Sequence, residues 1–102
     1  MRLIVFFDLP MDTAPQRRSY ARFRKYLVKN GYLMMQKSVY SKLAIDGRMV
    51  DVLVARLSEN KPPEGLVQVL QVTEKQYASV VNIIGGQVDR EELDTTDGLV
   101  VL

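Results

Sequence analysis

An unbroken apolar run lies near the start of the chain and ends in a carboxylate that a proline soon follows. Residues 3–9 read Leu-Ile-Val-Phe-Phe-Asp-Leu, and Pro10 comes next. β-Branched and aromatic residues favour extended backbone, and apolar side chains at successive positions indicate a strand with both faces covered. We therefore expect a buried central strand that carries Asp8 to its tip. Asp8 is then either a turn residue beside Pro10 or a carboxylate that is paired, hydrogen-bonded or bound to a cation.

The composition limits the chemistry that a domain of this size can perform. The chain has 102 residues, of which 47% are hydrophobic, and this is enough for one two-layer core. It has no cysteine and no histidine, so disulfides, thiolate nucleophiles, imidazole bases and the common zinc sites are excluded. Any catalysis must use carboxylates, hydroxyls, lysine, arginine or a hard, oxygen-bound metal ion. The first residues lack a signal-peptide pattern and no segment reaches membrane-spanning length, so we expect a cytoplasmic protein without membrane contact.

Basic and acidic residues are segregated along the chain, although the formal net charge is only +2. Residues 13–45 contain no aspartate or glutamate, whereas residues 89–97 contain five acidic side chains and one arginine. A basic first half with an acidic tail favours a polyanionic partner on one face, or a self-association in which the tail meets the basic segment.

The basic segment is predicted to be a helix with one cationic side. Thr13 and Gln16 have the spacing of a capping box, Pro15 suits a first helical turn, and Gly31 supplies a left-handed stop. Apolar residues at helical spacing form its core stripe, namely Tyr20, Phe23 and Leu27. Basic residues at spacings of four, three and four form a second stripe, Arg18, Arg22, Lys25 and Lys29, flanked by Arg17 and Arg24. No glutamate is placed to pair with this basic stripe, which therefore either binds an external anion such as nucleic acid or is a solvated face.

The rest of the chain predicts short strands and two more helical segments. Residues 32–43 have strong strand character, and their periodicity leaves open whether they form one long strand or two strands joined near residues 36–38. The further elements are a helix from Asp46 to about Asn60, a strand over 66–72, a capped helical turn from Thr73 to about Ser79, and a strand over 80–84. If residues 32–43 form a hairpin, the order is β-α-β-β-α-β, which is the ferredoxin-like α+β sandwich.

The end of the chain divides into an acidic loop and an apolar strand. Residues 87–97 are too acidic and too poor in apolar residues to pack independently, and residues 98–102 form an apolar strand that needs a pairing partner. We therefore predict one domain over residues 1–102, with a core over 1–86 and this tail over 87–102. The last strand either folds back onto its own chain or adds to the sheet of a partner subunit. Its candidate partner-binding residues are Leu99, Val100, Val101 and Leu102.

Several of these segments, in this order, resemble a known family, the small CRISPR-associated protein two, which serves in spacer acquisition. The resemblance covers nearly the whole chain and is strongest to the versions that accompany type II CRISPR systems. The segments that carry it are residues 3–10, Asp12-Thr13, Gln16–Tyr20, Arg22–Leu27, Met35–Ser41 and Val72–Tyr77.

The resemblance implies a ferredoxin-like protomer with a hairpin turn near Gln36-Lys37-Ser38. It also implies a homodimer in which the first strands come close together, with a C-terminal strand that joins the neighbouring subunit or engages an integrase partner. In the family, such dimers bridge integrase dimers and hold a double-stranded protospacer DNA across a basic surface. The candidate nucleic-acid contacts are then Arg17, Arg18, Arg22, Lys25, Lys29 and Ser38.

The family is also similar to metal-dependent endonucleases, in which the aspartate that matches Asp8 is assigned to Mg²⁺. Asp8 is therefore the candidate catalytic residue and metal ligand, with Mg²⁺ or Mn²⁺ as cofactor. One carboxylate per protomer gives few ligands, so the site would exist only in the dimer. Ser38 is either a phosphate contact or the donor of a hairpin hydrogen bond.

Three functions follow from these expectations. The first is a DNA-binding scaffold within a spacer-integration complex. The second is an endonuclease acting on RNA or double-stranded DNA through an Asp8 pair, and the third is a toxin-like ribonuclease with the same fold.

Overall fold

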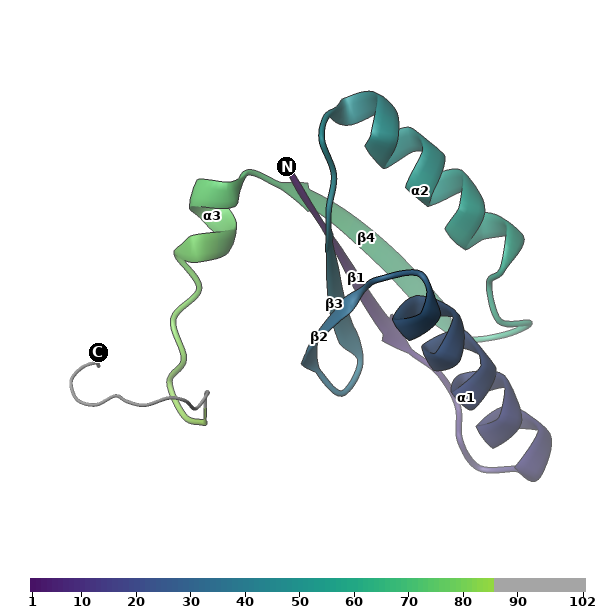
Figure 1. The fold of residues 1–102 in the computed structure, drawn as a ribbon. Helices are drawn as coiled ribbons and strands as arrows, with labels where there is room; N and C mark the ends of the chain where they lie inside the picture. Colours follow the sequence, from purple (N-terminus) through teal and green to yellow (C-terminus); the bar gives the residue numbers. More distant parts are fainter. Residues whose placement is uncertain (86–102) are drawn as a thin grey trace.

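β1 lies inside a four-stranded antiparallel sheet whose order is β2-β3-β1-β4. The fold is taken from a computed structural model that describes residues 1–85 (Figure 1). Its elements are β1 (Arg2–Asp8), α1 (Ala14–Lys29), β2 (Leu33–Gln36), β3 (Val39–Leu43), α2 (Gly47–Glu59), β4 (Leu66–Val72) and α3 (Glu74–Ala78). The first six elements have the β-α-β-β-α-β order, so the chain is an α+β protein with the predicted ferredoxin-like arrangement.

Side-chain caps set the beginnings of the three helices where the sequence predicts them. Thr13 accepts a hydrogen bond from the Gln16 backbone N–H, and the Gln16 side chain accepts one from the Thr13 N–H at 2.9 Å. Asp46 caps α2 by accepting from the Met49 N–H at 3.0 Å, and a second capping box begins α3. These contacts satisfy backbone donors that a helix leaves free at its first turn. At the other end of α1, Gly31 adopts a φ of +85°, which confirms the predicted left-handed stop.

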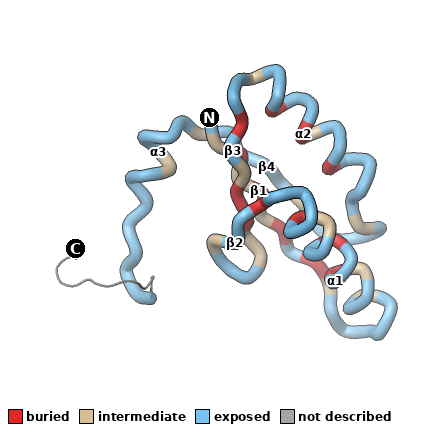
Figure 2. The backbone as a smooth tube through the Cα atoms, viewed as in Figure 1, coloured by how far each residue is buried: buried red, intermediate tan, exposed pale blue. Residues whose placement is uncertain are grey.

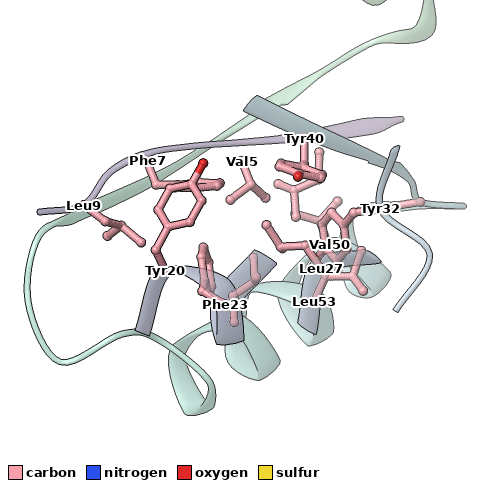
Figure 3. Close-up of a cluster of buried hydrophobic side chains, with 13 residues drawn as sticks. Val5, Phe7, Leu9, Tyr20, Phe23, Leu27, Tyr32, Tyr40, Val50 and Leu53 are labelled. Carbon is pink, nitrogen blue, oxygen red and sulfur yellow. The ribbon is translucent and has the colours of Figure 1, made fainter. Parts of the chain in front are cut away.

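The hydrophobic core lies between one face of the sheet and the two long helices, as Figure 2 shows by the buried segments of β1, α1 and α2. The core side chains alternate along β1 and recur at helical spacing in α1 and α2. They include Leu3, Val5, Phe7, Tyr20, Phe23, Leu27, Tyr40, Val50, Leu53 and Leu57 (Figure 3). Phe7 is packed among aromatic rings, with Phe23 edge-on at 5.1 Å between ring centroids and Tyr40 stacked at 6.0 Å. Such pairs add to the free energy gained by burying their apolar area.

The opposite face of the sheet is covered only in part, which corrects the prediction that both faces of β1 are covered. Residues of β1 alternate between buried and half-buried, so Ile4 and Phe6 remain half-buried on the side away from α1 and α2. On the same face of β4, Leu66 and Leu70 are each 54% exposed. The prediction is wrong for residues 1–85 because the only helix on that side is α3, which is five residues long. We call this side the open face.

The predicted strand over residues 80–84 does not form. Val80 and Val81 continue from α3 without a strand partner among residues 1–85, and Ile83 and Ile84 are 91% and 93% exposed. The apolar composition alone could not specify a strand, because a strand needs an adjacent backbone with which to pair. The acidic loop and the last strand, including Leu99, Val100, Val101 and Leu102, lie outside the described residues. Within the described range, no helix is long and apolar enough to cross a membrane.

Two core tyrosines have buried hydroxyls without a hydrogen-bond partner among residues 1–85. They are Tyr32 and Tyr40. Burial raises the pKa of Tyr32 to about 12, because the phenolate would lose its hydration. Both phenols therefore contribute to the core mainly through their rings.

Candidate active site and nucleic-acid interface

Asp8 ends β1 on the open face of the sheet. Successive strand residues point to opposite faces, and Val5 and Phe7 point toward the helices, so Phe6 and Asp8 point away from them. Asp8 is exposed and lies opposite Leu66 of β4. Its carboxylate has no hydrogen bond or ion pair to any other residue in the described part of the chain. The carboxylate is therefore available to a ligand.

A hollow of about 170 Å³ lies beside Asp8 at this end of the open face. Most of its lining is apolar, and three of its side chains are polar. The lining residues are Phe6, Phe7, Asp8, Ser38, Val39, Leu66 and Gln68. A carboxylate is a ligand for hard cations, so Asp8 can hold a cation or a cationic group that enters this hollow.

Ser38 lies in the turn between β2 and β3 and is fixed from two sides. The Phe7 backbone N–H donates to the Ser38 carbonyl at 3.1 Å, which ties the turn to β1. The Tyr20 hydroxyl of α1 donates to the Lys37 carbonyl at 3.1 Å and lies 3.3 Å from the Ser38 Oγ. The predicted hairpin is confirmed, and the hydroxyl of Ser38 is bonded to α1 rather than within the hairpin. Sequence reasoning placed Tyr20 only in the core, and the one available signal was a tyrosine where phenylalanine would fill the same space.

Gly65 brings the loop before β4 against the end of β1. Its φ is +102°, and a Cβ at this position would lie 2.9 Å from the Asp8 carbonyl and 2.7 Å from a methyl carbon of Leu9. Glycine is needed here for both the backbone conformation and the space. The loop thereby fixes the backbone that carries Asp8.

We expect Gly65→Ala to lower the free energy of unfolding by about 1–3 kcal/mol, through backbone strain and overpacking. Denaturant unfolding of the variant and the wild type measures this difference. Gly47→Ala is the matched control, because its Cβ meets nothing within 4 Å and its φ is not positive. An equal stability of the Gly65 and Gly47 variants would contradict the expectation.

The basic stripe lies on the side of α1 that faces away from the sheet. Its four members are exposed, and none forms an ion pair within residues 1–85, as predicted: Arg18, Arg22, Lys25 and Lys29. Arg17 differs from them, because its guanidinium donates to the Met11 and Asp12 carbonyls at 3.2 Å and so supports the loop after β1. The stripe lies outside the helix layer and Asp8 lies on the open face, so the structure keeps these two candidate sites apart.

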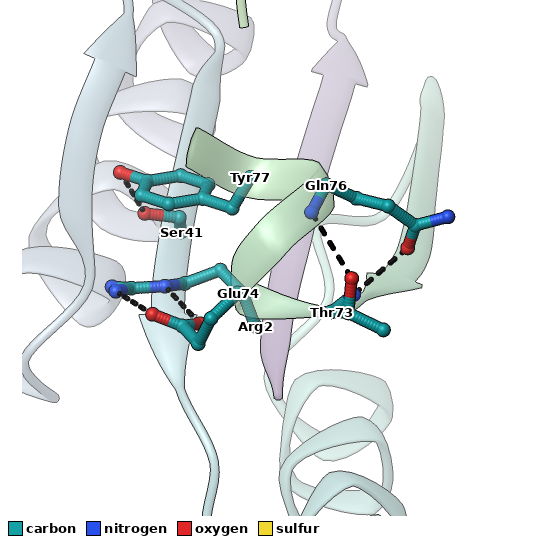
Figure 4. Close-up of polar contacts among 6 residues, drawn as sticks. All are labelled: Arg2, Ser41, Thr73, Glu74, Gln76 and Tyr77. Atoms are coloured by element: carbon teal, nitrogen blue, oxygen red, sulfur yellow. Dashed lines mark hydrogen bonds and ion pairs between the residues drawn. The ribbon is translucent and has the colours of Figure 1, made fainter. Parts of the chain in front are cut away.

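α3 is held over the other end of the open face by a cluster that sequence reasoning missed (Figure 4). Arg2 pairs with Glu74 at 2.8 Å and lies over the Tyr77 ring, 4.2 Å from its centroid. The hydrogen bond to Glu74 raises the pKa of Arg2, and the same bond lowers the pKa of Glu74. The Ser41 hydroxyl, which is buried, donates to the Tyr77 hydroxyl at 3.4 Å. α3 therefore covers the Arg2 end of β1 and leaves the Asp8 end uncovered.

Comparison with known proteins decides the family. Residues 1–80 match the family model described as CRISPR associated protein Cas2. The chain belongs to the Cas2 family. Among its relatives in that family, a CRISPR-associated endoribonuclease Cas2 from Treponema denticola is 56% identical over 102 residues, which cover 100% of both chains. Another of the same name from Streptococcus mutans serotype c is 42% identical, over 100% of this chain and 93% of the relative.

The fold of the chain also matches a solved structure. A crystal structure of Streptococcus pyogenes Cas2 superposes with a TM-score of 0.62, covering 81% of this chain and 99% of that one. The two sequences are 19% identical, so this likeness concerns the fold alone.

The Asp8 carboxylate suits a hard cation, but one protomer provides only half of such a site. Among residues 1–85, no group of three or more His, Cys, Asp or Glu side chains is placed to hold a metal ion. Carboxylate and hydroxyl oxygens are ligands that Mg²⁺ accepts, and Mg²⁺ retains several waters when protein ligands are few. In one protomer, Asp8 is the one carboxylate among the residues that line this hollow. Complete coordination by protein carboxylates would require Asp8 of a second copy.

Proposed function

We propose that this chain is a DNA-binding subunit of a CRISPR spacer-acquisition complex, which holds a double-stranded protospacer and bridges integrase dimers. The observation that carries the DNA-binding part is the basic stripe of α1, whose four cations are exposed on one side of the helix and form no ion pair within residues 1–85. At about 1.5 Å per residue, the stripe from Arg18 to Lys29 is about 16 Å long and can follow a row of phosphates. Phosphate contacts carry no sequence information, so binding depends weakly on DNA sequence and strongly on salt. The bridging role rests on membership of the family.

The proposed assembly is a homodimer formed through the open face. Ile4 and Phe6 lie at the centre of this face and remain half-buried, and the apolar side chains of β4 beside them are exposed. A symmetric dimer uses the same patch on both copies, so pairing across β1 brings the two Asp8 carboxylates to one interface. A second copy therefore supplies both the missing apolar cover and the second carboxylate.

The proposed receiving site for the C-terminal residues lies on a neighbouring subunit. β4 is an edge strand, and a hollow of about 160 Å³ between it and α2 has apolar lining that includes Val54, Leu57 and Val67. An added strand would pair with the free edge and place alternate side chains in such a hollow. We assign this role, or contact with the integrase, to the strand predicted over residues 98–102.

Phe6→Glu is expected to convert the dimer to a monomer, with the dissociation constant rising by at least about a hundredfold. The reason is that an unpaired charge would be buried in an apolar interface. Light scattering across a concentration series measures the change. Val28→Glu introduces the same charge at an apolar residue that is 52% exposed on α1, and it should leave the dimer intact. Dimerisation that persists in the Phe6 variant would exclude the open face as the interface.

A second candidate function is a Mg²⁺- or Mn²⁺-dependent endonuclease that acts on RNA or double-stranded DNA. The observation that favours it is the Asp8 carboxylate, which has no partner within residues 1–85 and lines the hollow on the face assigned to the second copy. Relatives of the chain also carry the name endoribonuclease. A cation held by two Asp8 side chains would supply an activated water and neutralise charge on a phosphodiester.

Spacer integration by the purified protein with its integrase partner separates the two functions. Asp8→Ala is compared with the wild type after both are shown to be dimeric and to bind DNA equally. If the chain is a scaffold, the variant integrates spacers at the wild-type rate. A loss of integration while the dimer and DNA binding survive would place the Asp8 carboxylate in the reaction and put the nuclease function first.

A further inference from the structure

α3 depends on contacts with the sheet to stay in place. It has five residues, and a helix of this length is unstable on its own in water, even with a capping box. Arg2 of β1 supplies the main contacts, because its guanidinium donates to both carboxylate oxygens of Glu74 at 2.8 and 3.1 Å and lies over the Tyr77 ring (Figure 4). Two hydrogen bonds to one carboxylate fix an orientation that a single exposed ion pair does not. Arg2 therefore ties α3 to the start of β1.

α3 covers the half of the open face that carries Arg2. Ser41 points to this face, because it lies opposite Ile4 in the register of β1 and β3. Its side chain is nevertheless 0% exposed, and its hydroxyl donates to the Tyr77 hydroxyl. The Tyr77 ring thus occupies the space above this part of β3, as Figure 4 shows. A second molecule cannot pack on the sheet there while α3 is in place.

The half of the open face that carries Asp8 has no such cover within residues 1–85. Phe6 is half-buried there, Leu66 is 54% exposed, and the hollow of about 170 Å³ lies beside them. A second molecule can reach apolar side chains of β1 and β4 at this end without meeting α3.

We propose that α3 is the boundary of the dimer interface: Arg2 is a positioning residue that holds α3 over one half of the open face and so confines the second copy to the half that carries Asp8. This inference rests on the open-face dimer proposed above. A symmetric dimer uses the same patch on both copies, so a patch limited to this half brings the two Asp8 ends closer together than the two Arg2 ends. Blocking the other half excludes pairings that overlap along the whole sheet, in which the two carboxylates would lie further apart.

Distances between spin labels in the dimer test this boundary without reference to activity. The chain has no cysteine, so Glu64→Cys and Ile45→Cys, made separately, each give one label per protomer. Position 64 precedes the glycine that lies against the Asp8 carbonyl, and position 45 follows Ala44, whose N–H donates to the Met1 carbonyl at the other end of the sheet. Both positions are exposed in loops, outside the proposed interface.

Double electron–electron resonance should show a shorter separation for the labels at position 64 than for those at position 45. We expect the difference to be about 10 Å or more, because about 20 Å of strand separates the two ends of β1. Arg2→Glu places a carboxylate against Glu74 and releases α3, so this difference should fall to less than about half, while the protein remains dimeric. Combining Arg2→Glu with Glu74→Arg restores the ion pair and should restore most of the difference.

Lys75→Glu is the matched control, because it makes the same change of charge at an exposed residue of α3 that has no ion pair within residues 1–85. It should leave both distances as in the wild type. Thermal unfolding of each variant shows that the fold is retained, and light scattering shows that it is dimeric.

The other outcomes separate this inference from the dimer on which it rests. If the wild type is dimeric but the labels at position 45 are as close as those at position 64, or if Arg2→Glu changes neither distance, the open-face dimer stands and the boundary role is wrong. Equal effects of Arg2→Glu and Lys75→Glu, or a charge swap that restores nothing, would exclude the ion pair as the anchor. A dimer that dissociates in Arg2→Glu would make α3 part of the interface instead of its boundary. A wild type that is monomeric would overturn the proposed dimer and this inference with it.

Discussion

The double substitution Arg18→Glu with Arg22→Glu is expected to abolish the binding of duplex DNA at moderate salt. These residues lie one turn apart in the N-terminal half of the basic stripe, are exposed, and have no ion pair within residues 1–85. Reversing both charges removes two phosphate contacts per protomer and adds repulsion. The affinity should fall by at least about a hundredfold, and the slope of log affinity against log salt should become shallower by about two per protomer. Fluorescence anisotropy with a labelled duplex, over several salt concentrations and without divalent metal, measures both quantities.

Arg48→Glu with Arg56→Glu is the matched control for this experiment. Both arginines are exposed on α2, and the change in net charge is the same. A much smaller loss of affinity is expected, since these residues are not part of the stripe. Equal losses in the two double variants would mean that binding follows net charge. An unchanged affinity and salt slope in the α1 variant would mean that the stripe is a solvated face.

The parts of the fold that depend on local sequence could be predicted. The helices begin where a capping side chain lies three residues before its partner, as at Thr13 and Asp46, because these contacts are made within one turn. β1 could be predicted because its five central residues, Leu3 to Phe7, are all apolar and include β-branched and aromatic side chains. For residues 32–43, periodicity left the hairpin open, and the resemblance to a family was needed to choose it.

The parts that depend on distant contacts could not be predicted from local pattern. The strand over 80–84 fails because no backbone lies beside it in the described residues, and a sequence pattern does not report its partner. The open face was missed because an apolar run looks the same whether its second side is covered by a helix or left for another molecule. The roles of Tyr20 and Arg2 were missed because their partners, Ser38 and Glu74, are 18 and 72 residues away.

Asp8→Asn is expected to lower the rate of metal-dependent cleavage of RNA or double-stranded DNA by a factor on the order of a thousand. Removing the charge removes the ligand that the proposed cation needs, and with it several kcal/mol of stabilisation of the transition state. The dimer and its stability should be retained, because Asn keeps the size of the side chain and Asp8 is exposed. Cleavage of labelled substrates with Mg²⁺ or Mn²⁺, and with a chelator, measures the effect.

Asp12→Asn is the control for Asp8→Asn, since Asp12 is an exposed carboxylate four residues further along whose side chain makes no hydrogen bond within residues 1–85. Cleavage that survives in the Asp8 variant would assign the activity to another group.

The loss of DNA binding and the loss of metal-dependent cleavage should also be separable, because the stripe lies outside the helix layer and Asp8 lies on the open face. The Asp8 variant should bind duplex DNA like the wild type, and the Arg18 and Arg22 variant should still bind Mn²⁺. A protein in which both substitutions abolished both properties would require one shared site, which this arrangement of the two surfaces does not allow.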